Sequence, residues 1–93
     1  MTEQTIFEAP GFVGKVVGSL GEMLVIDALV ESDIAAHAAE ADEFAVVLSG
    51  RFEVEINHFV RICCSGDYLI VPQGSDHAIR MLEPGRLLLI GKA

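Results

Sequence analysis

Residues 66–77, with the sequence GDYLIVPQGSDH, decide how the chain folds. Gly66 permits a tight turn with a positive φ, and the mostly apolar residues after it form a strand that crosses the core. Pro72 ends the strand pairing because proline has no amide hydrogen to donate. Gly74 permits a sharp loop, and His77 opens the next strand, where a rigid backbone can hold its imidazole. The stretch therefore predicts two strands joined by a tight loop, with a fixed histidine at the start of the second.

Short apolar strands separated by turns continue on both sides of this stretch. The clearest alternation is RFEVEI at residues 51–56, in which Phe52, Val54 and Ile56 face inward while the glutamates face water. The pattern predicts eight strands, or nine if an Ala-rich piece at 34–39 counts: 12–17, 23–30, 43–48, 51–56, 59–64, 68–71, 77–82 and 86–90. Many short strands with weak helix signals predict an all-β barrel, because closure removes the exposed strand edges.

The composition limits the class of protein. Ninety-three residues make one domain, residues 1–93, and 52% hydrophobic residues are many for a monomer of this size, so we expect a filled barrel and a homodimer. A net charge of -8 repels phosphate backbones and anionic lipids, so we expect neither a nucleic-acid partner nor a membrane partner. No apolar run approaches the roughly 18 residues that span a bilayer, and residues 1–5 lack the start of a signal peptide, so the expected location is cytoplasmic.

The two cysteines, Cys63 and Cys64, are adjacent. Neighbouring side chains on a strand point to opposite faces of the sheet, so the pair does not suit a structural disulfide. We expect free thiols.

Residues 66–77 resemble the second motif of the cupin superfamily, G(x)5PxG(x)2H, which they match at Gly66, Pro72, Gly74 and His77. The asparagine that closes that motif is replaced by Met81. The first cupin motif, G(x)5HxH(x)3-4E(x)6G, is present in part: Glu43 and Gly50 satisfy E(x)6G, whereas its opening glycine is absent. The resemblance covers about residues 33–90 and implies a cupin-type β-barrel, also described as a double-stranded β-helix or jelly roll.

In cupins, two histidines and a glutamate of the first motif and a histidine of the second hold a divalent metal. The resemblance carries this role to Glu43 and His77, and to His37 if the shorter spacer applies. With the longer spacer, Ala36 and Ala38 stand where the histidines belong. On a regular strand His37 points away from the side that these alanines share, whereas a bulge would turn it inward. The resemblance then implies a two-histidine, one-carboxylate set for iron, manganese, nickel or zinc.

Three hypotheses about function follow. The first is a metal-dependent small-molecule enzyme with His37, Glu43 and His77 as the ligands of the metal. The second is a metal-free binding module that holds a small organic molecule in the barrel, because an apolar pocket with a few polar groups is the usual small-molecule site. The third is a structural protein whose barrel is filled. We favour a pocket that binds a metal, a small organic molecule or both, and the sequence names no substrate.

Overall fold

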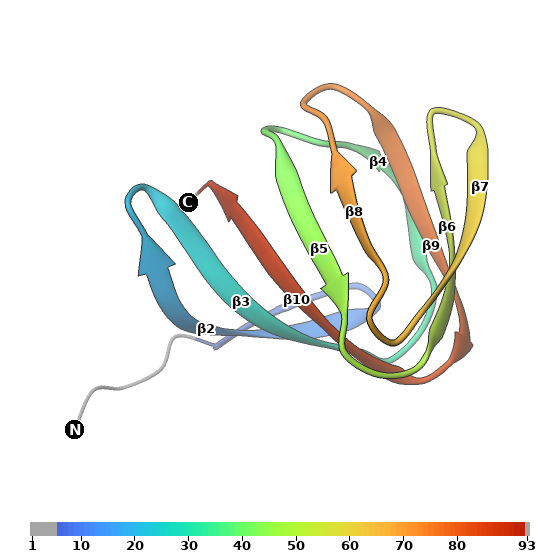
Figure 1. Ribbon diagram of the computed structural model, residues 1–93, viewed down its shortest axis with the longest axis horizontal. Coiled ribbons are helices and arrows are strands. Elements are labelled where there is room, and N and C mark those ends of the chain that lie inside the picture. The colour runs from blue at the N-terminus through green and yellow to red at the C-terminus, as the bar shows by residue number, and fades with distance from the viewer. Residues whose placement is uncertain (1–5, 93) are drawn as a thin grey trace.

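The computed structural model describes residues 6–92, which form two antiparallel sheets and no helix. Six strands pair in the order β1-β2-β3-β10-β5-β8: β1 (Ile6–Ala9), β2 (Phe12–Leu20), β3 (Met23–Val30), β5 (Glu43–Val47), β8 (Tyr68–Val71) and β10 (Gly85–Lys92). Four strands pair in the order β4-β9-β6-β7: β4 (Ile34–Ala38), β6 (Arg51–Ile56), β7 (Phe59–Cys64) and β9 (Asp76–Glu83). The sheets face each other as the two walls of a barrel, which confirms the predicted all-β fold (Figure 1).

The strand bounds follow the sequence closely where apolar alternation meets a turn. β3, β6, β7 and β8 begin and end at the predicted residues. Asn57 and His58 form the two-residue turn between β6 and β7, with positive φ values of 48° and 72°. Such turns match the twist of the strands that they join. The turn glycine Gly66 also has the predicted positive φ, of 90°.

The N-terminal part of the fold differs from the prediction. Strand β1 was not predicted; it pairs with β2 alone and so forms one edge of the larger sheet. β2 runs on to Leu20 because a register shift between Val16 and Gly18 lets the strand continue through the expected turn. The Ala-rich piece is a strand, β4. Residues 1–5, on which the expected absence of a signal peptide rested, lie outside the described residues.

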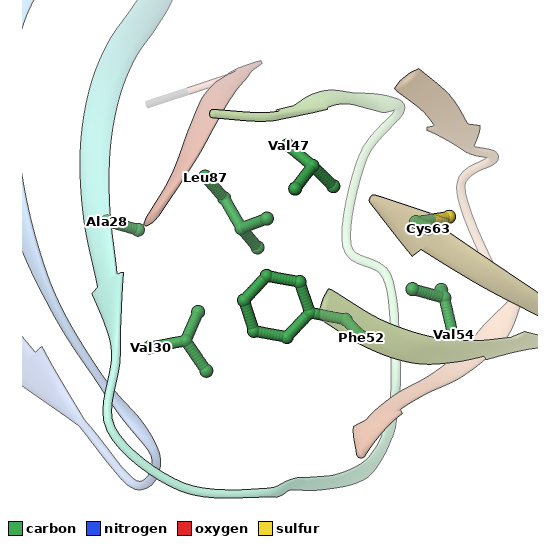
Figure 2. Close-up of a cluster of buried hydrophobic side chains, with 7 residues drawn as sticks. All are labelled: Ala28, Val30, Val47, Phe52, Val54, Cys63 and Leu87. Atoms are coloured by element: carbon green, nitrogen blue, oxygen red, sulfur yellow. The ribbon is translucent and has the colours of Figure 1, made fainter. Parts of the chain in front are cut away.

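The core lies between the sheets toward the end where the β5–β6 and β9–β10 turns meet, which we call the closed end. Figure 2 shows the Phe52 ring among Val30, Val47 and Leu87, which come from three strands of the larger sheet. Phe52 is 0% exposed. Its neighbour on β6, Glu53, faces outward and forms an ion pair with Arg80, so the predicted alternation of β6 is confirmed.

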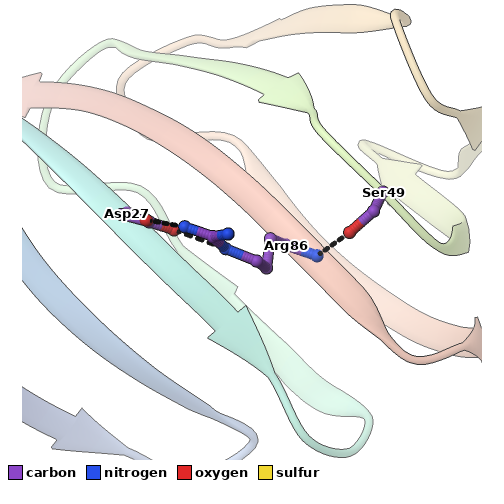
Figure 3. A network of polar contacts seen from close by, with 3 residues as sticks. All are labelled: Asp27, Ser49 and Arg86. Carbon is purple, nitrogen blue, oxygen red and sulfur yellow. Dashed lines mark hydrogen bonds and ion pairs between the residues drawn. The ribbon is translucent and has the colours of Figure 1, made fainter.

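Two turns fit tightly against each other at the closed end. Gly50 has a φ of 85°, and a Cβ atom there would lie 2.6 Å from the Pro84 carbonyl oxygen. The Arg86 backbone N–H donates to the Ser49 hydroxyl over 3.1 Å, and the Arg86 guanidinium forms hydrogen bonds with the Asp27 carboxylate (Figure 3). These contacts tie β10 to both β3 and the β5–β6 turn.

Both cysteines are free thiols, as predicted: Cys63 is buried and Cys64 is exposed. Burial raises the pKa of the Cys63 thiol. Within residues 6–92, no helix has the length and apolar character needed to cross a bilayer. The cytoplasmic location stays a prediction.

Candidate functional site

A cavity of about 140 Å³ lies inside the barrel, between the core and the end opposite to the closed end, which we call the mouth. Alternate residues of facing strands line it, as the period of two along a strand requires. Its apolar wall includes Ala45 and Val47 from β5, Phe52 and Val54 from β6, and Leu87 and Leu89 from β10. The small residues Ala28 and Ala45, both nearly fully buried, leave part of the interior unfilled. A completely filled barrel is therefore not what the structure shows.

Three polar residues line this cavity: His37, Glu43 and His77. Glu43 is the first residue of β5 in the larger sheet, and His77 is the second residue of β9 in the smaller one. His37 lies directly opposite His77 on β4. β5 and β9 begin at the same end of the barrel, so the polar residues gather at the mouth (Figure 1). The two sheets thus bring Glu43 and His77 to one shared interior, as the sequence predicts.

A bulge in β4 decides where His37 points. Ile34 pairs with Ile79, whereas His37 pairs with His77, and the register shifts between these two pairs. On a regular strand Ile34 and His37, three residues apart, would face opposite sides. The extra residue reverses the alternation, so both side chains line the cavity. The bulge therefore turns His37 toward the cavity, as the sequence made conditional, although its side chain stays exposed at the mouth.

The alanines of the longer spacer do not line this cavity. Ala36 lies beside a separate outer hollow with Glu55 and His58, and Ala38 lies at the mouth. The small side chains that open the interior are Ala28 and Ala45. Nothing local to β3 marks Ala28 as facing a cavity.

The loop before β9 holds His77 in place. The Gly74 N–H donates to the Ala39 carbonyl over 2.8 Å, and the Ala39 N–H donates to the Ser75 carbonyl over 3.0 Å. On the other side, the Asp76 N–H donates to the Asn57 side-chain oxygen over 3.0 Å, and the Asn57 N–H donates back to the Asp76 carbonyl over 2.8 Å. The motif's loop therefore ties the end of β4 to the start of β9, which fixes the spacing of the two histidines.

The two imidazole rings contact each other. Their centroids are 4.1 Å apart with an interplanar angle of 58°. His37 Nδ1 lies 3.0 Å from the Ala35 carbonyl oxygen. Since a carbonyl oxygen only accepts, Nδ1 is the nitrogen that carries the proton and Nε2 is left with a lone pair when the ring is neutral. This bond fixes the tautomer of His37.

His77 is 8% exposed, and its Nδ1 atom is buried with no hydrogen-bond partner among the described residues. Burial, and secondarily the neighbouring His37, lowers the pKa of His77, although Ser75, Glu43 and Asp76 act in the opposite direction. The imidazole is therefore held neutral at neutral pH. A neutral imidazole can donate one hydrogen bond and accept one, so the site has an unused polar group next to an apolar space.

The residues present do not fit a metal ion in their observed arrangement. In the described part of the chain, no three His, Cys, Asp or Glu side chains lie close enough together to hold a metal. His37, Glu43 and His77 share the cavity, but a catalytic metal site usually has about three converging protein ligands. Under the shorter spacer Ala39, a buried residue, stands where the second histidine of the first motif belongs. The donor set is thus one imidazole short of the family's four.

A second hollow, of about 310 Å³, adjoins the cavity at the mouth and shares Glu43 and both histidines with it. The β4–β5 connection contributes Glu40 and Asp42, and the end of β10 contributes Lys92. Glu40 and Asp42 were not predicted as site residues. Their closeness to Glu43 along the chain could have indicated that they belong to the site. Lys92 gives no such sign, because it lies 49 positions after Glu43.

Comparisons with known proteins give the family. The cupin domain family matches residues 23–91. No curated protein matches the sequence. An RmlC-like cupin from Shewanella frigidimarina NCIMB 400 superposes with a TM-score of 0.84 at 19% identity, over 97% of this chain and 84% of the other.

Two further solved structures share the fold. KdgF from Halomonas sp. has a TM-score of 0.78 at 24% identity, over 96% of this chain and 83% of the other. An iron(II) form of HppE has a TM-score of 0.82 at 14% identity, over 96% of this chain and 56% of the other. At such identities the likeness concerns the fold alone. The family model covers most of the chain, and both the two-sheet barrel and the glycine and proline turn before His77 agree with it. This chain therefore belongs to the cupin domain family.

Proposed function

We propose that this cupin binds a small, largely apolar organic molecule in its interior cavity. The observation that carries the proposal is the combination of an apolar wall with one polar end, which is formed by His37, Glu43 and His77. A ligand that fills the apolar space and brings a polar group to these side chains gains both apolar burial and hydrogen bonds. The ligand binds with its apolar body among Ala45, Val54 and Leu89 and its polar group at the mouth.

The size of the cavity sets the scale of the ligand and of its affinity. A cavity of about 140 Å³ is close to the roughly 150 Å³ that holds a benzene-sized molecule in another protein. Burying about 150 Å² of apolar ligand surface at about 25 cal/mol per Å² gives about 4 kcal/mol, which corresponds to a millimolar Kd. Larger ligands must extend into the hollow at the mouth.

Benzyl alcohol is a suitable first probe because it has one ring and one neutral polar group. At about ten times its Kd, it should raise the melting temperature by about 5–10 °C. In an NMR titration, the amide shifts should concentrate on β5, β6 and β10, which line the cavity.

The matched variants are Ala45→Leu and Ala36→Leu. Ala45 lines the cavity, so a larger side chain there occupies the space of the ligand, whereas Ala36 is exposed outside it. Ala45→Leu should abolish binding and Ala36→Leu should leave Kd unchanged within about twofold. Equal affinity in the two variants, or no binding by the parent protein, would contradict the proposal.

A divalent metal at His37, Glu43 and His77 is the second candidate. The contact between the two histidine rings, the fixed tautomer of His37 and the shared cavity with Glu43 favour it. One neighbour in fold, HppE, has been solved with iron(II). Metal binding here requires the three side chains to converge further than they do in the structure.

Elemental analysis tests this candidate. After growth with added iron, manganese, nickel or zinc, a metal site should retain close to one equivalent, and His77→Ala should lose it, while His58→Ala, in an exposed turn, should not. Less than about a tenth of an equivalent in the parent protein rejects the candidate.

A homodimer is the proposed assembly. β7 and β8 are edge strands of the two sheets, and they carry exposed apolar side chains: Phe59, Val60, Ile62, Tyr68 and Ile70. Exposed apolar side chains on two strand edges favour a protein–protein contact there. Light scattering after size-exclusion chromatography should give twice the chain mass, and the double variant Phe59→Ser with Ile70→Ser should give a monomer. A monomeric parent protein contradicts the assembly but leaves the cavity proposal unaffected.

A further inference from the structure

The charges at the mouth bear on the class of ligand that the cavity would take, provided that it binds an organic molecule as proposed above. The hollow at the mouth is lined by three carboxylates, from Glu40, Asp42 and Glu43, and by one ammonium, from Lys92. Asp42 is partly engaged, because its Oδ1 accepts a hydrogen bond from the Gln73 N–H over 2.8 Å. The local charge is negative, so an anionic ligand group would be repelled.

The arginine side chains that could bind a ligand carboxylate or phosphate are placed elsewhere. Within residues 6–92, all four arginines contact other parts of the fold: Arg51 contacts Glu83, Arg80 contacts Glu53, Arg86 contacts Asp27, and Arg61 donates to the Tyr68 carbonyl. Figure 3 shows the Arg86 pair, which spans β10 and β3. No guanidinium of residues 6–92 lines the cavity or the hollow at the mouth. The site therefore lacks the paired N–H donors with which arginine binds a carboxylate or phosphate.

The polar groups where the two hollows meet are rich in acceptors. Glu43 is half-buried, and its carboxylate forms no hydrogen bond or ion pair within residues 6–92. The protonated Nδ1 of His37 is used by Ala35, which leaves the Nε2 lone pair. His77 is more than nine-tenths buried and lines both hollows. Such a group of acceptors matches a ligand that brings several N–H donors.

We infer that the ligand is a small primary amine, bound as an ammonium ion at Glu43 and the two histidines, with an apolar body of about six to eight heavy atoms in the cavity. The ammonium has three N–H donors. Glu43 accepts one with full opposite charge, and the histidine face offers the others an acceptor. The apolar body lies between Ala45 and Leu89, which face each other across β5 and β10.

Three probes of one size separate charge from shape: benzylamine, benzyl alcohol and benzoate. Titrations followed by NMR at pH 7.5 and low ionic strength should give benzylamine a Kd about tenfold below that of benzyl alcohol, because a hydrogen bond to a charged group is worth more than one between neutral groups. Benzoate should show no binding at the same concentrations. Raising the salt concentration should reduce the preference for the amine.

Two variants assign the preference to Glu43. Glu43→Gln should remove the tenfold preference for benzylamine over benzyl alcohol, whereas Glu43→Asp, which keeps the charge, should retain most of the preference. Glu53→Gln is the matched control, because Glu53 lies on β6 outside both hollows and pairs with Arg80. It should change neither Kd. Near-parent melting temperatures in each variant establish that they fold.

The outcomes separate the two proposals. If benzyl alcohol binds and benzylamine binds no better, or if the preference survives Glu43→Gln, the inference about amines is wrong and the proposed cavity function stands. If benzoate binds best, the ligand is an anion and the inference is overturned. If none of the three probes binds the parent protein, both proposals fail.

Discussion

The closed end and the mouth of the barrel use the same strands in different ways. At the closed end, inward positions hold Phe52, Val47 and Leu87, which are at most 5% exposed and pack against one another (Figure 2). At the mouth, the inward-facing positions of the same alternation hold Glu43 and His77. Glu43 is half-buried, and His77 is buried without a full set of hydrogen bonds. Strand alternation therefore decides which residues face inward at both ends. The residue types then decide whether an end stabilises the fold, as the apolar closed end does, or offers polar groups to a ligand, as the mouth does.

The largest effect should come from the centre of the closed end. Phe52→Ala removes a side chain with no exposed surface and leaves a cavity, so the free energy of unfolding should fall by about 3–5 kcal/mol. Urea unfolding measures this loss. Leu20→Ala is the control, since Leu20 is 61% exposed, and it should cost less than about 0.5 kcal/mol. A loss below about 1 kcal/mol for Phe52→Ala would show that the closed end is not the stabilising core.

A pair of glycines compares the backbone at the two ends. Gly50 at the closed end and Gly74 at the mouth have similar φ values, 85° and 81°, but only a Cβ atom at Gly50 meets other atoms. Gly74→Ala should therefore cost about 1 kcal/mol of backbone strain, and Gly50→Ala about 2 kcal/mol or more because the Pro84–Gly85 turn must also move. Chemical denaturation of both variants gives the difference. Equal losses would mean that the two turns at the closed end do not fit as tightly as the structure shows.

The acid sensitivity of stability should come from the mouth. The pKa of His77 is lowered in the folded state, so between that pKa and the unfolded value of about 6.5 the unfolded chain binds more protons. The contribution is fully present above about pH 6.5 and is lost as the pH falls, by at most about 1.4 kcal/mol per pH unit. Urea unfolding at a series of pH values should show a shallower slope for His77→Gln than for the parent protein. Parallel slopes would contradict this assignment, and His58→Gln, in an exposed turn, serves as the control.

The smallest effect should follow from removing the charge that faces the cavity. Glu43→Leu should change the free energy of unfolding by less than about 1 kcal/mol in either direction, because the carboxylate has no hydrogen bond or ion pair within residues 6–92 to lose. Thermal and urea unfolding measure the change. A loss above about 2 kcal/mol would indicate that Glu43 has a structural role instead of one in recognition.

Much of the fold was predictable because its causes are local. Each of three features sets the backbone within a few residues: the apolar period of two in β6, the proline and glycine before His77, and the turn at Asn57. Strand β1 was missed because it pairs only with β2 at an edge, so nothing in its own four residues requires a strand. The continuation of β2 past Val16 was missed for a related reason, since a register shift depends on the partner strand.

The candidate site was predictable only in part. Glu43 and His77 followed from their motif spacings, and the structure brings them to one cavity. His37 remained conditional, because its direction depends on the bulge opposite β9. Lys92 and Ala28 could not be found from the chain alone, since both reach the site through the pairing of β10 with its neighbours.

The sequence by itself determined the all-β class, most strand bounds and the two residues at the mouth that face inward, because alternation and turn chemistry operate over a few residues. The tertiary structure alone decided that His37 turns inward beside His77, that the barrel keeps an apolar cavity, and that carboxylates instead of guanidinium groups surround its mouth. The physical reason is that register, packing volume and local charge arise between strands far apart in the chain, and no single stretch of sequence specifies them.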